Sequence, residues 1–446
     1  MQMDLKSYPI DPNKIKFVDG QHDSAQWFNI VAGYRSLLIT SSSKTWLLFE
    51  SDTFIFSAMF YALLSAGKSI VLPQNAQPQH IREIKMRVQA SIGSAAIGPD
   101  IVTQDIWPTQ PVVDLHINSD AEVTFFTSGS TGQGKAVVKQ FSQLQTEISC
   151  LETSFGATVK DSVFLSTVSH QHIYGLLFKV LWPISMGHAF VCQAFEYPEH
   201  IVNKITAGDF ASVTLIASPA HLHRLCLDNP LLPVKQHVHC IFSSGGALDA
   251  DKNIKLQQQL TCHLIEVYGS TETGGIGWRQ RASITDDIWK TFSGVRVAHQ
   301  HKTELLLLES PYITQDQFHG DDRIELITDK QFRLLGRADD IVKIEEKRIS
   351  LNEVQMRCKQ HQYVQDVCVL VIGSKRKQLA AVIELNSLGK EVKGTMPLYL
   401  FNRLFRSYLA QWFEAVTLPK KFRYPLQIPY NAQGKLNRQA MESYFE

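Results

Sequence analysis

The segment TSGSTGQGKAV, residues 127–137, gathers the residue types that bind phosphate. Its first eight residues include four with hydroxyl side chains and three glycines, and a lysine follows at position 135. Glycine lets backbone N–H groups approach anionic oxygens closely, and the lysine ammonium adds a positive charge. We therefore predict a phosphate-binding loop that uses Thr127, Ser128, Gly129, Ser130, Thr131, Gly132 and Lys135.

The same segment nearly fits the nucleotide-binding pattern G-x-x-x-x-G-K-[ST], starting at Gly129. In that pattern a Ser or Thr follows the lysine and holds Mg²⁺, and a helix starts at the lysine. Here the residue is Ala136, and the β-branched run AVVK predicts a strand. We expect the helix to start only at Ser142, with Gln145 completing a capping box. A P-loop NTPase, which would hydrolyse ATP without an acid, stays an alternative that fits these elements poorly.

The elements around this loop alternate between strands and helices. We expect short strands at residues 36–42 (SLLITSS) and 69–73 (SIVLP), and a strand at 123–126 (VTFF) that enters the loop. Between the first two lies an apolar run that ends near Gly67. That run is about 14 residues long, whereas a membrane span needs roughly 20, so a buried helix is predicted. This alternation predicts a layered α/β fold.

Composition narrows the class of protein. A chain of 446 residues is too long for one hydrophobic core, so two or more domains are expected. The formal net charge of +1 gives no overall signature of nucleic-acid binding. The seven cysteines form no C-x-x-C pair and the N-terminus lacks a leader pattern, which favours a reducing, cytoplasmic location without disulfides. Residues 340–446 hold 17 Lys/Arg against 10 Asp/Glu, which suits either an acidic partner or a solvated surface.

The loop resembles the T-S-G-[ST]-T-G-x-P-K signature of the AMP-forming adenylating superfamily, which includes acyl-CoA and aryl-CoA synthetases, adenylation domains of peptide synthetases, and luciferase. Four further motifs follow in the family's order. YGSTETGG (residues 268–275) resembles Y-G-x-T-E, and SSGGAL (243–248) resembles S-G-G-A-P-L. GRADDIVKIEEKRISLNEVQ (336–355) resembles G-R-x-D-D-x-V-K-I-x-G-x-R-I-x-x-x-E-I-E, and YNAQGKLNR (430–438) resembles T-x-x-G-K-x-x-R.

The resemblance implies roles for residues of the nucleotide site. Tyr268 would stack on adenine, Thr271 would lie near the α-phosphate, and Glu272 would hold Mg²⁺, for which a carboxylate is a suitable ligand. Lys435 would be a mobile lysine that reaches the substrate carboxylate and the α-phosphate. The small residues of two turns would let adenine and the acyl group lie against backbone: Gly245, Gly246, Ala247 and Gly269.

Further roles concern the ribose, the hinge and the acid. Arg337 would bond the ribose, and in HGDDR the spacing favours Asp322 over Asp321 as the second ribose ligand. Asp339 would be the hinge. SHQHIYGLL (169–177) resembles a loop that lines the acid pocket, with His172 near the substrate carboxylate, although a purely structural role for this histidine stays open. Candidates for the rest of the acid pocket are Tyr174, Gly175, Gly246, Gly275, Ile276 and Trp278.

The family's fold implies a large N-terminal adenylation domain of layered sheets and helices, residues 1–338, and a small mobile α+β domain, residues 339–446. In the first half-reaction a carboxylate attacks the α-phosphate of MgATP and gives acyl-AMP and pyrophosphate. The small domain then turns on Asp339, and the thiol of a phosphopantetheine group takes the acyl group. That thiol would belong to CoA or to an acyl carrier protein.

Three positions depart from the family's pattern. Gly134 stands where the loop usually has Pro, and Gly320 replaces the Thr of T-G-D. Glu346 stands where a Gly usually shapes the pantetheine tunnel. A carrier protein is favoured over CoA by three features: this last change, the basic C-terminal part and the compact N-terminal region. The chain also resembles stand-alone AMP-ligases of aryl-polyene or fatty-acid-like pathways.

Two other readings stay open, a catalytically silent nucleotide-binding protein and a luciferase-like oxygenase. Four H-x-H pairs, starting at residues 170, 221, 237 and 299, lack a Cys or acidic partner at fixed spacing. The only metal expected is therefore Mg²⁺, which arrives with ATP.

Overall fold

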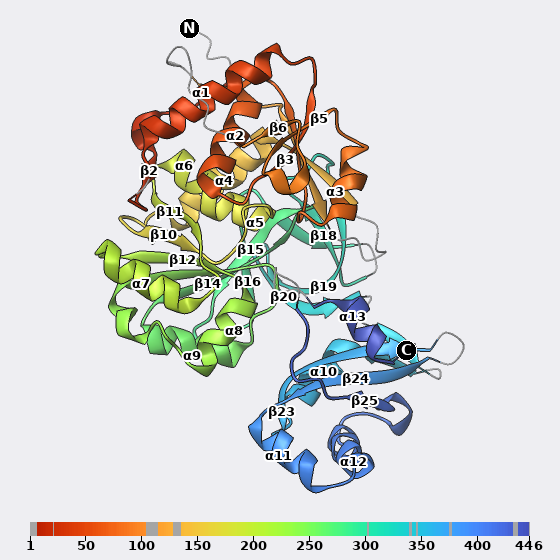
Figure 1. Cartoon of the computed structure of the whole chain (residues 1–446). Coiled ribbons are helices and arrows are strands. Elements are labelled where there is room, and N and C mark those ends of the chain that lie inside the picture. Colours follow the sequence, from red (N-terminus) through yellow and green to blue (C-terminus); the bar gives the residue numbers. More distant parts are fainter. Residues whose placement is uncertain are drawn as a thin grey trace. The chain divides into compact units, whose positions relative to one another are not determined.

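The computed structural model describes residues 7–20, 22–103, 115–127, 135–300, 303–338, 341–344, 347–373, 377–430 and 436–445. The chain divides into two compact units, shown in Figure 1. The first consists of Met1–Val297, Leu308–Phe318 and Thr328–Phe332. The second consists of Ala298–Leu307, His319–Ile327 and Arg333–Glu446.

A six-stranded sheet in the first unit carries the phosphate-binding segment. Its strands are parallel except for the last, which pairs antiparallel with its neighbour. The predicted strands at 69–73 and 123–126 are confirmed as members of this sheet. In spatial order the strands are β6 (Ile101–Val102), β5 (Ala90–Gly93), β3 (Thr45–Phe49), β4 (Ser69–Leu72), β8 (Glu122–Thr127) and β9 (Lys135–Gln140).

The helices of this region partly correct the sequence prediction. Helix α2 (Thr53–Ser65) is almost wholly buried and ends before Gly67, as expected. Residues 36–42 are not a strand, because α1 (Ser24–Thr40) runs through most of them. Val31, Tyr34 and Leu38 are buried whereas residues 36, 37, 39 and 40 are exposed, which is the spacing of a helix face and not strand alternation. Helix α3 (Pro78–Lys85) follows β4 along the chain.

The element after the phosphate-binding hairpin begins earlier than predicted. Helix α4 (Phe141–Phe155) has its capping box at Gln140 and Gln143, not at Ser142 and Gln145. Gln145 is instead buried within the helix. The order strand, loop, strand, helix is nevertheless as predicted, and it differs from the strand, loop, helix order of a P-loop NTPase.

A second sheet of the first unit has six consecutive parallel strands, from β14 to β2. Helices α7 (Pro198–Gly208), α8 (Pro219–Leu227) and α9 (Ala250–Leu260) cover it, as Figure 1 shows in green. Buried Ile, Leu and Val side chains of these helices and strands share one hydrophobic core. Within this unit the strand order is β16 (Ile288–Thr291), β15 (Gly274–Gln280), β14 (His263–Ser270), β13 (Val238–Ser243), β12 (Val213–Ala217), β10 (Val163–Ser166), β11 (Ala189–Ala194) and β2 (Lys16–Phe17).

A buried segment with an irregular helix links β10 to β11. Helix α5 (Ile173–Gly175) leads into a π-helical stretch, Leu176–Leu181, and then into α6 (Trp182–Met186). All six residues of the π-helical stretch are buried, Lys179 among them. Such stretches are rare and often lie at functional sites.

The second unit is of the α+β type. A hairpin of β21 (Ile341–Ile344) and β22 (Lys347–Ser350) precedes α10 (Leu351–Lys359). A three-stranded sheet of β23 (Val364–Ile372), β24 (Gln378–Leu385) and β25 (Lys421–Arg423) shares a core with α10 and α12 (Leu398–Leu409). The remaining helices are α11 (Ser387–Thr395) and α13 (Arg438–Glu442).

The remaining elements are short or lie at the division between the two units. Strands β1 (Ser7–Pro9) and β7 (His116–Asn118) pair antiparallel. Among the residues described, no helix is both long and apolar enough to cross a membrane. The other elements are the strands β17 (Arg296–His299), β18 (Leu305–Glu309), β19 (Phe318–Thr328) and β20 (Gln331–Arg337) and the 3₁₀ turns η1 (Pro12–Lys14), η2 (Ala95–Ile97), η4 (Leu232–His237), η6 (Ala415–Thr417) and η7 (Ser443–Phe445).

Candidate active site

The antiparallel hairpin of β8 and β9 fixes both ends of the phosphate-binding segment. Thr127 pairs with Lys135 across the hairpin. The Nζ atom of Lys135 lies 3.9 Å from Oε1 of Glu272, and these side chains are 65% and 27% exposed. Both charges are therefore open to a ligand. Five predicted phosphate ligands lie outside the described residues: Ser128, Gly129, Ser130, Thr131 and Gly132.

The YGSTETGG motif forms the turn between β14 and β15. Gly269 pairs with Gly275, and Ser270 pairs with Gly274, so Thr271 and Glu272 sit at the tip, both half-buried. A Cβ atom at Gly269 would lie 2.3 Å from the carbonyl oxygen of Gly274, so only glycine fits there. The hairpin register thus holds the predicted metal ligand and the predicted phosphate ligand on adjacent residues.

Tyr268, the predicted adenine-stacking residue, lies at the end of β14 just before this turn. Its ring is half-buried and lies 5.6 Å from the ring of Trp289 and 6.0 Å from that of Phe332. Both neighbours are tilted to it rather than stacked on it. The aromatic neighbours therefore support the position of the ring.

Two buried charged residues form hydrogen bonds with the backbone of this turn, and the sequence analysis identified neither of them. Lys139 on β9 donates hydrogen bonds from Nζ to the main-chain carbonyl oxygens of Glu272, at 2.8 Å, and Tyr312, at 2.6 Å. Glu147 on α4 accepts a hydrogen bond at Oε1 from the main-chain N–H of Gly275, at 2.7 Å. Both sides of the turn are thus tied to the phosphate-binding hairpin and its helix.

Burial changes the acidity of this pair. Burial lowers the pKa of Lys139 to about 8, against the opposing effect of the carboxylates of Glu147 and Glu272. Burial raises the pKa of Glu147 to about 7, while the Gly275 hydrogen bond and the charge of Lys139 act in the other direction. Desolvation disfavours the charged form of each group. The two groups therefore titrate within a narrow pH range near neutrality.

The spacing of the apolar residues around Lys139 and Glu147 could have shown from the sequence that both are buried. Lys139 lies two positions after the buried Val137, on the same face of a strand. Glu147 lies three positions after the buried Leu144 and four before the buried Leu151, on the inner face of a helix. A charged residue on a face that is otherwise apolar indicates a buried partner.

The SSGGAL motif forms an exposed turn at the end of β13. Gly245 has a φ of 88°, a conformation that favours glycine. Gly246 and Ala247 are also exposed, so a flat ligand can reach their backbone. The hydroxyl of Ser244 donates to the carbonyl oxygen of Val267 at 2.9 Å. That bond fixes this turn to β14, one residue before Tyr268.

The segment of residues 169–175 is anchored to the carboxyl ends of two strands. The hydroxyl oxygen of Tyr174 lies 3.2 Å from the carbonyl oxygen of Ala217 and 3.0 Å from that of Phe242. Burial raises the pKa of Tyr174, so its hydroxyl stays protonated and donates. A Cβ at Gly175 would lie 2.0 Å from the carbonyl oxygen of Ser169. Glycine at this position therefore permits the tight turn.

The two histidines of this segment differ in surroundings. His172 precedes α5 and is half-buried. His170 is buried, with Nδ1 3.0 Å from Oγ1 of Thr53 and Nε2 2.7 Å from the carbonyl oxygen of Glu50. Burial and the charge of Lys179 lower the pKa of His170 to about 3, so this histidine is neutral. His170 therefore has a structural role, of the kind that the sequence left open for His172.

Strand β15 places the other acid-pocket candidates. Gly275 and Ile276 are buried. The ring of Trp278 is half-buried, 5.2 Å from the ring of Phe155, with the Nζ atom of Lys290 5.1 Å from its centre. These contacts fix its ring by packing on one side and by a cation on the other.

The predicted ribose ligands meet in the second unit. Arg337 donates from Nη2 to Oδ2 of Asp321 at 3.3 Å, while its Nη1 lies 3.9 Å from Oδ1 of Asp322. The side chain of Asp321 is 70% exposed and that of Asp322 is 26% exposed. The structure therefore brings the arginine to both candidates. The predicted hinge Asp339 and the predicted lysine Lys435 lie outside the described residues.

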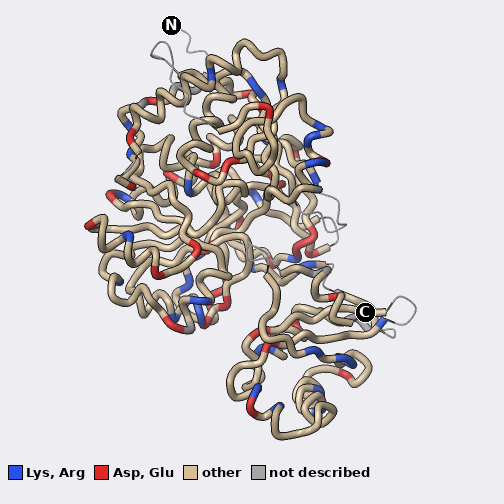
Figure 2. The backbone as a smooth tube through the Cα atoms, viewed as in Figure 1, with Lys and Arg blue, Asp and Glu red and all other residues tan. Residues whose placement is uncertain are grey.

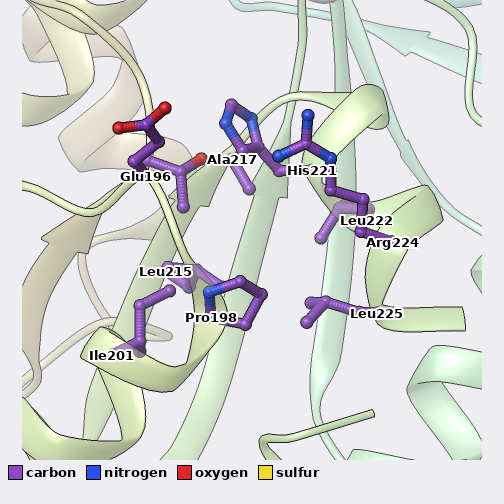
Figure 3. Close-up of a pocket in the computed structure, with 10 residues that line it drawn as sticks. Glu196, Pro198, Ile201, Leu215, Ala217, His221, Leu222, Arg224 and Leu225 are labelled. Carbon is purple, nitrogen blue, oxygen red and sulfur yellow. The ribbon is translucent and has the colours of Figure 1, made fainter. Parts of the chain in front are cut away.

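A small cavity lies elsewhere in the first unit, between α7, α8 and β12 (Figure 3). Its volume is about 10 Å³, which is room for one water molecule at most. His221 at its rim lies 2.8 Å from the hydroxyl of Ser218 through Nδ1, and burial lowers the pKa of His221 to about 4. A cavity of this size cannot hold a substrate, so it belongs to the packing of the unit.

Comparison with known proteins agrees with the resemblance that the motifs indicate. Residues 99–300 match the family described as AMP-binding enzyme. A 4-coumarate–CoA ligase of Halorhodospira halophila is 27% identical over 70% of this chain and 74% of that protein.

Two solved structures share the fold over almost their whole length. ATP-bound MatB from Rhodopseudomonas palustris has a TM-score of 0.80 at 15% identity, covering 98% of this chain and 96% of that chain. A benzoate CoA ligase from Burkholderia xenovorans LB400 has a TM-score of 0.77 at 15% identity, covering 96% of each. The motifs, the matched residues 99–300 and the fold all agree with similarity to the AMP-binding enzyme family.

Proposed function

We propose that this protein uses ATP to convert a carboxylic acid, aryl or fatty, into an acyl adenylate, and then transfers the acyl group to a phosphopantetheine thiol. The observation that carries the proposal is the approach of Lys135 to Glu272, which places a cation beside a hard carboxylate at the end of a phosphate-binding hairpin. The similarity to a 4-coumarate–CoA ligase and to a benzoate CoA ligase supports an acid as substrate.

The electrostatic task in such a site is to bring two anions together. Fixed positive groups aimed at developing charge lower the barrier because they need no reorganisation during the reaction. Lys135 and the hydroxyl-rich segment would offset phosphate charge, and Thr271 would lie beside the reacting phosphorus. The carboxylate of Glu272 is a suitable oxygen ligand for an Mg²⁺ ion that arrives with ATP. Lys139 would keep this carboxylate in place.

The proposed second half-reaction depends on movement of residues 339–446. Lys435 would act in adenylation, and rotation about Asp339 would then withdraw it and admit the thiol. Rotation of a domain about a short hinge is a common switching device. Arg337, Asp322 and Tyr268 would hold the nucleotide through both steps, and His172 would face the acyl carboxylate.

The proposed acceptor is an acyl carrier protein rather than CoA. A groove of about 540 Å³ runs along α12 and faces β25, in the part of the second unit that the structure describes. Its charged side chains are Arg403, Arg406 and Lys420. Figure 2 shows the blue Lys and Arg positions of this unit. Complementary charge speeds association and selects partners, so this groove suits the acidic surface of a protein. The residues that line it are Tyr399, Asn402, Arg403, Arg406, Ser407, Ala410, Leu418, Lys420 and Phe422.

The decisive experiment for acid activation is ATP–pyrophosphate exchange with a panel of aryl and aliphatic acids. Acid-dependent exchange supports adenylation and ranks the substrates. Acid-independent release of phosphate, with no exchange for any acid, would contradict the proposal and favour hydrolysis of a nucleoside triphosphate instead.

The choice of acceptor has its own experiment. Thioester formation is measured with CoA and with a phosphopantetheinylated acyl carrier protein, for the wild type and for Arg403→Glu/Arg406→Glu. We expect the charge reversal to raise KM for the carrier protein at least about tenfold, with acid-dependent exchange unchanged. Lys390→Glu, an exposed change on α11 of the same unit, is the matched control. Efficient use of CoA, with no use of the carrier protein, would contradict this choice.

A further inference from the structure

A cluster of three different ligand types lies outside the motifs that are predicted to bind the nucleotide. Asp19, His22 and Cys192 each offer one donor atom, and all three atoms lie within 4.8 Å of one another. We propose that these three side chains form a binding site for a divalent transition metal ion, for which Zn²⁺ is the best match. This inference is independent of the proposed acid activation.

The backbone brings the carboxylate and the thiol together. Strands β2 and β11 run parallel, with Lys16 opposite Ala189 and Phe17 opposite Phe190. The pairing continues with a hydrogen bond from the N–H of Val18 to the carbonyl oxygen of Phe190. Cys192 follows Phe190 by two residues, and Asp19 follows Phe17 by two. Cys192 shares a face of β11 with Phe190, and Asp19 lies in the bend that follows β2, where its carboxylate comes close to the thiol.

The histidine is fixed by independent contacts. His22 donates its main-chain N–H to Oδ1 of Asp19 at 3.2 Å, and its Nδ1 lies 2.8 Å from Oδ2 of the same carboxylate. The imidazole also stacks on the ring of Phe54, with centres 4.0 Å apart. The ring plane and the nitrogen that faces the carboxylate are therefore set before any ion binds. Orientation of a ligating histidine by its surroundings is typical of metal sites.

The chemistry of the three donors favours zinc. Thiolate, imidazole and carboxylate are its usual protein ligands, and three protein ligands leave a fourth position for water. Magnesium and calcium prefer all-oxygen sites. Cys192 is buried and the side chain of Asp19 is only 10% exposed, whereas that of His22 is 24% exposed, which leaves a path for an ion.

The charges around the site fit a cation once the thiol has lost its proton. Burial and the carboxylate of Asp19 raise the pKa of Cys192, so the metal-free thiol is protonated. Asp52 and Lys179 also act on this thiol, with opposite signs. Metal binding would release the thiol proton, as is usual for Cys ligands. The bound ion would then tie the segment before α1 to β11.

The test uses the full chain without an affinity tag and titrates it with Co²⁺ as a spectroscopic substitute for Zn²⁺. All seven cysteines are free and buried, so a cobalt–thiolate charge-transfer band identifies a buried cysteine. We expect the band to saturate at one equivalent and to disappear on addition of Zn²⁺. Cys192→Ser should abolish it, and His22→Ala should weaken Co²⁺ binding at least about tenfold.

Cys262→Ser is the matched control, because Cys262 is also a buried thiol whose pKa is raised by burial. This variant should keep the band. Thermal unfolding of each variant without metal checks that it folds, and added Zn²⁺ should raise the Tm of the wild type but not that of Cys192→Ser. The absence of a band in the wild type, or its survival in Cys192→Ser, would overturn the proposal.

Discussion

Lys139 donates a hydrogen bond from Nζ to the main-chain carbonyl oxygen of Glu272, 2.8 Å away. The two residues are 133 positions apart in the chain. The bond therefore links the phosphate-binding hairpin to the turn that carries the proposed metal ligand. A small displacement of a positioned group can cost a large factor in rate. The backbone of Glu272 is thus held by a lysine that lies outside the motifs.

Lys139→Met should lower both stability and exchange activity. Loss of the Lys139 ammonium leaves the buried carbonyl oxygens of Glu272 and Tyr312 without their charged donor, which costs about 1.5–3 kcal/mol. Loss of the bond to Glu272 should lower the rate of ATP–pyrophosphate exchange roughly 100-fold. Urea unfolding and exchange assays measure the two effects.

Two further variants separate stability from positioning. Lys139→Met/Glu147→Gln also removes the carboxyl group whose ionised form the charge of Lys139 favours, so it should recover part of the stability above neutral pH without recovering exchange. Lys255→Met is the control, because Lys255 is exposed and also donates to a main-chain carbonyl oxygen, that of Cys226, at 2.8 Å. Full exchange activity in folded Lys139→Met would refute the positioning role.

Stability should depend on pH through Glu147. Its folded pKa is raised from 4.5 to about 7, so the folded state holds a proton that the unfolded state has lost between these values. The unfolding free energy should therefore fall as pH rises from about 4.5 to 7, by at most about 1.4 kcal/mol per pH unit. Lys139 acts in the opposite sense from about pH 8 upward, because its folded pKa is lowered to about 8.

Glu147→Gln isolates this effect. The difference in unfolding free energy between wild type and variant, measured in urea at pH 5, 6 and 7, should fall steadily as pH rises. A difference that does not change with pH would mean that Glu147 titrates as in the unfolded chain.

Gly175→Ala should strain the segment that is anchored by Tyr174. The new Cβ would meet the carbonyl oxygen of Ser169 at 2.0 Å, so the backbone must shift, at a cost of about 1–3 kcal/mol. Gly246→Ala is the control, because its Cβ would meet only Cγ of Pro219, at 3.7 Å. Urea unfolding should separate the two variants, and equal stability would contradict the packing role of Gly175.

The two aspartates beside Arg337 can be told apart by ATP binding. Asp322→Asn should raise KM for ATP roughly 10-fold or more, since a hydrogen bond that involves a charged group contributes about 1.5–3 kcal/mol. Asp321→Asn should change it less than about threefold, because exposed ion pairs contribute little. A larger increase in KM for Asp321→Asn than for Asp322→Asn would assign the ribose to Asp321, which lies nearer to the guanidinium of Arg337.

Lys435→Ala should divide the two half-reactions. Because the lysine would offset charge only during adenylation, exchange should be lost, whereas thioester formation from supplied acyl-AMP should persist. Single-turnover assays of each half-reaction make the comparison. Loss of both half-reactions in a folded variant would contradict the proposed division of roles.

Local sequence patterns predicted much of the nucleotide-binding region. The β-branched AVVK run after Lys135 correctly indicated a strand rather than a helix, because strand propensity and inward-facing side chains agreed there. The YGSTETGG motif was identified by its resemblance alone, and the structure shows it as a tight turn in which a Cβ at Gly269 would meet the carbonyl oxygen of Gly274. Such features depend on residues close together in the chain.

Features that depend on distant partners were missed. Residues 36–42 became part of α1 because Leu38 packs inward with Tyr34 and Val31, a helix spacing that a short apolar run does not reveal. The start of α4 shifted because glutamine side chains, not serine, cap it. The hydrogen-bond partners of Lys139 lie more than 130 residues away in the chain. From the sequence alone, its burial could be inferred only from its place on the apolar face of a strand.

The π-helical stretch at Leu176–Leu181 makes this part of the chain tolerant of a change in length. A π-helical turn is wider than an α-helical turn and takes up an extra residue locally. The segments on either side therefore keep their rotational phase, and with it the bonds of Tyr174 to two strand ends and of Lys179 to Thr53. In a regular helix such as α1, by contrast, one added or removed residue would rotate one end by about 100° against the other. A one-residue change of length should thus be tolerated better in this stretch than in α1.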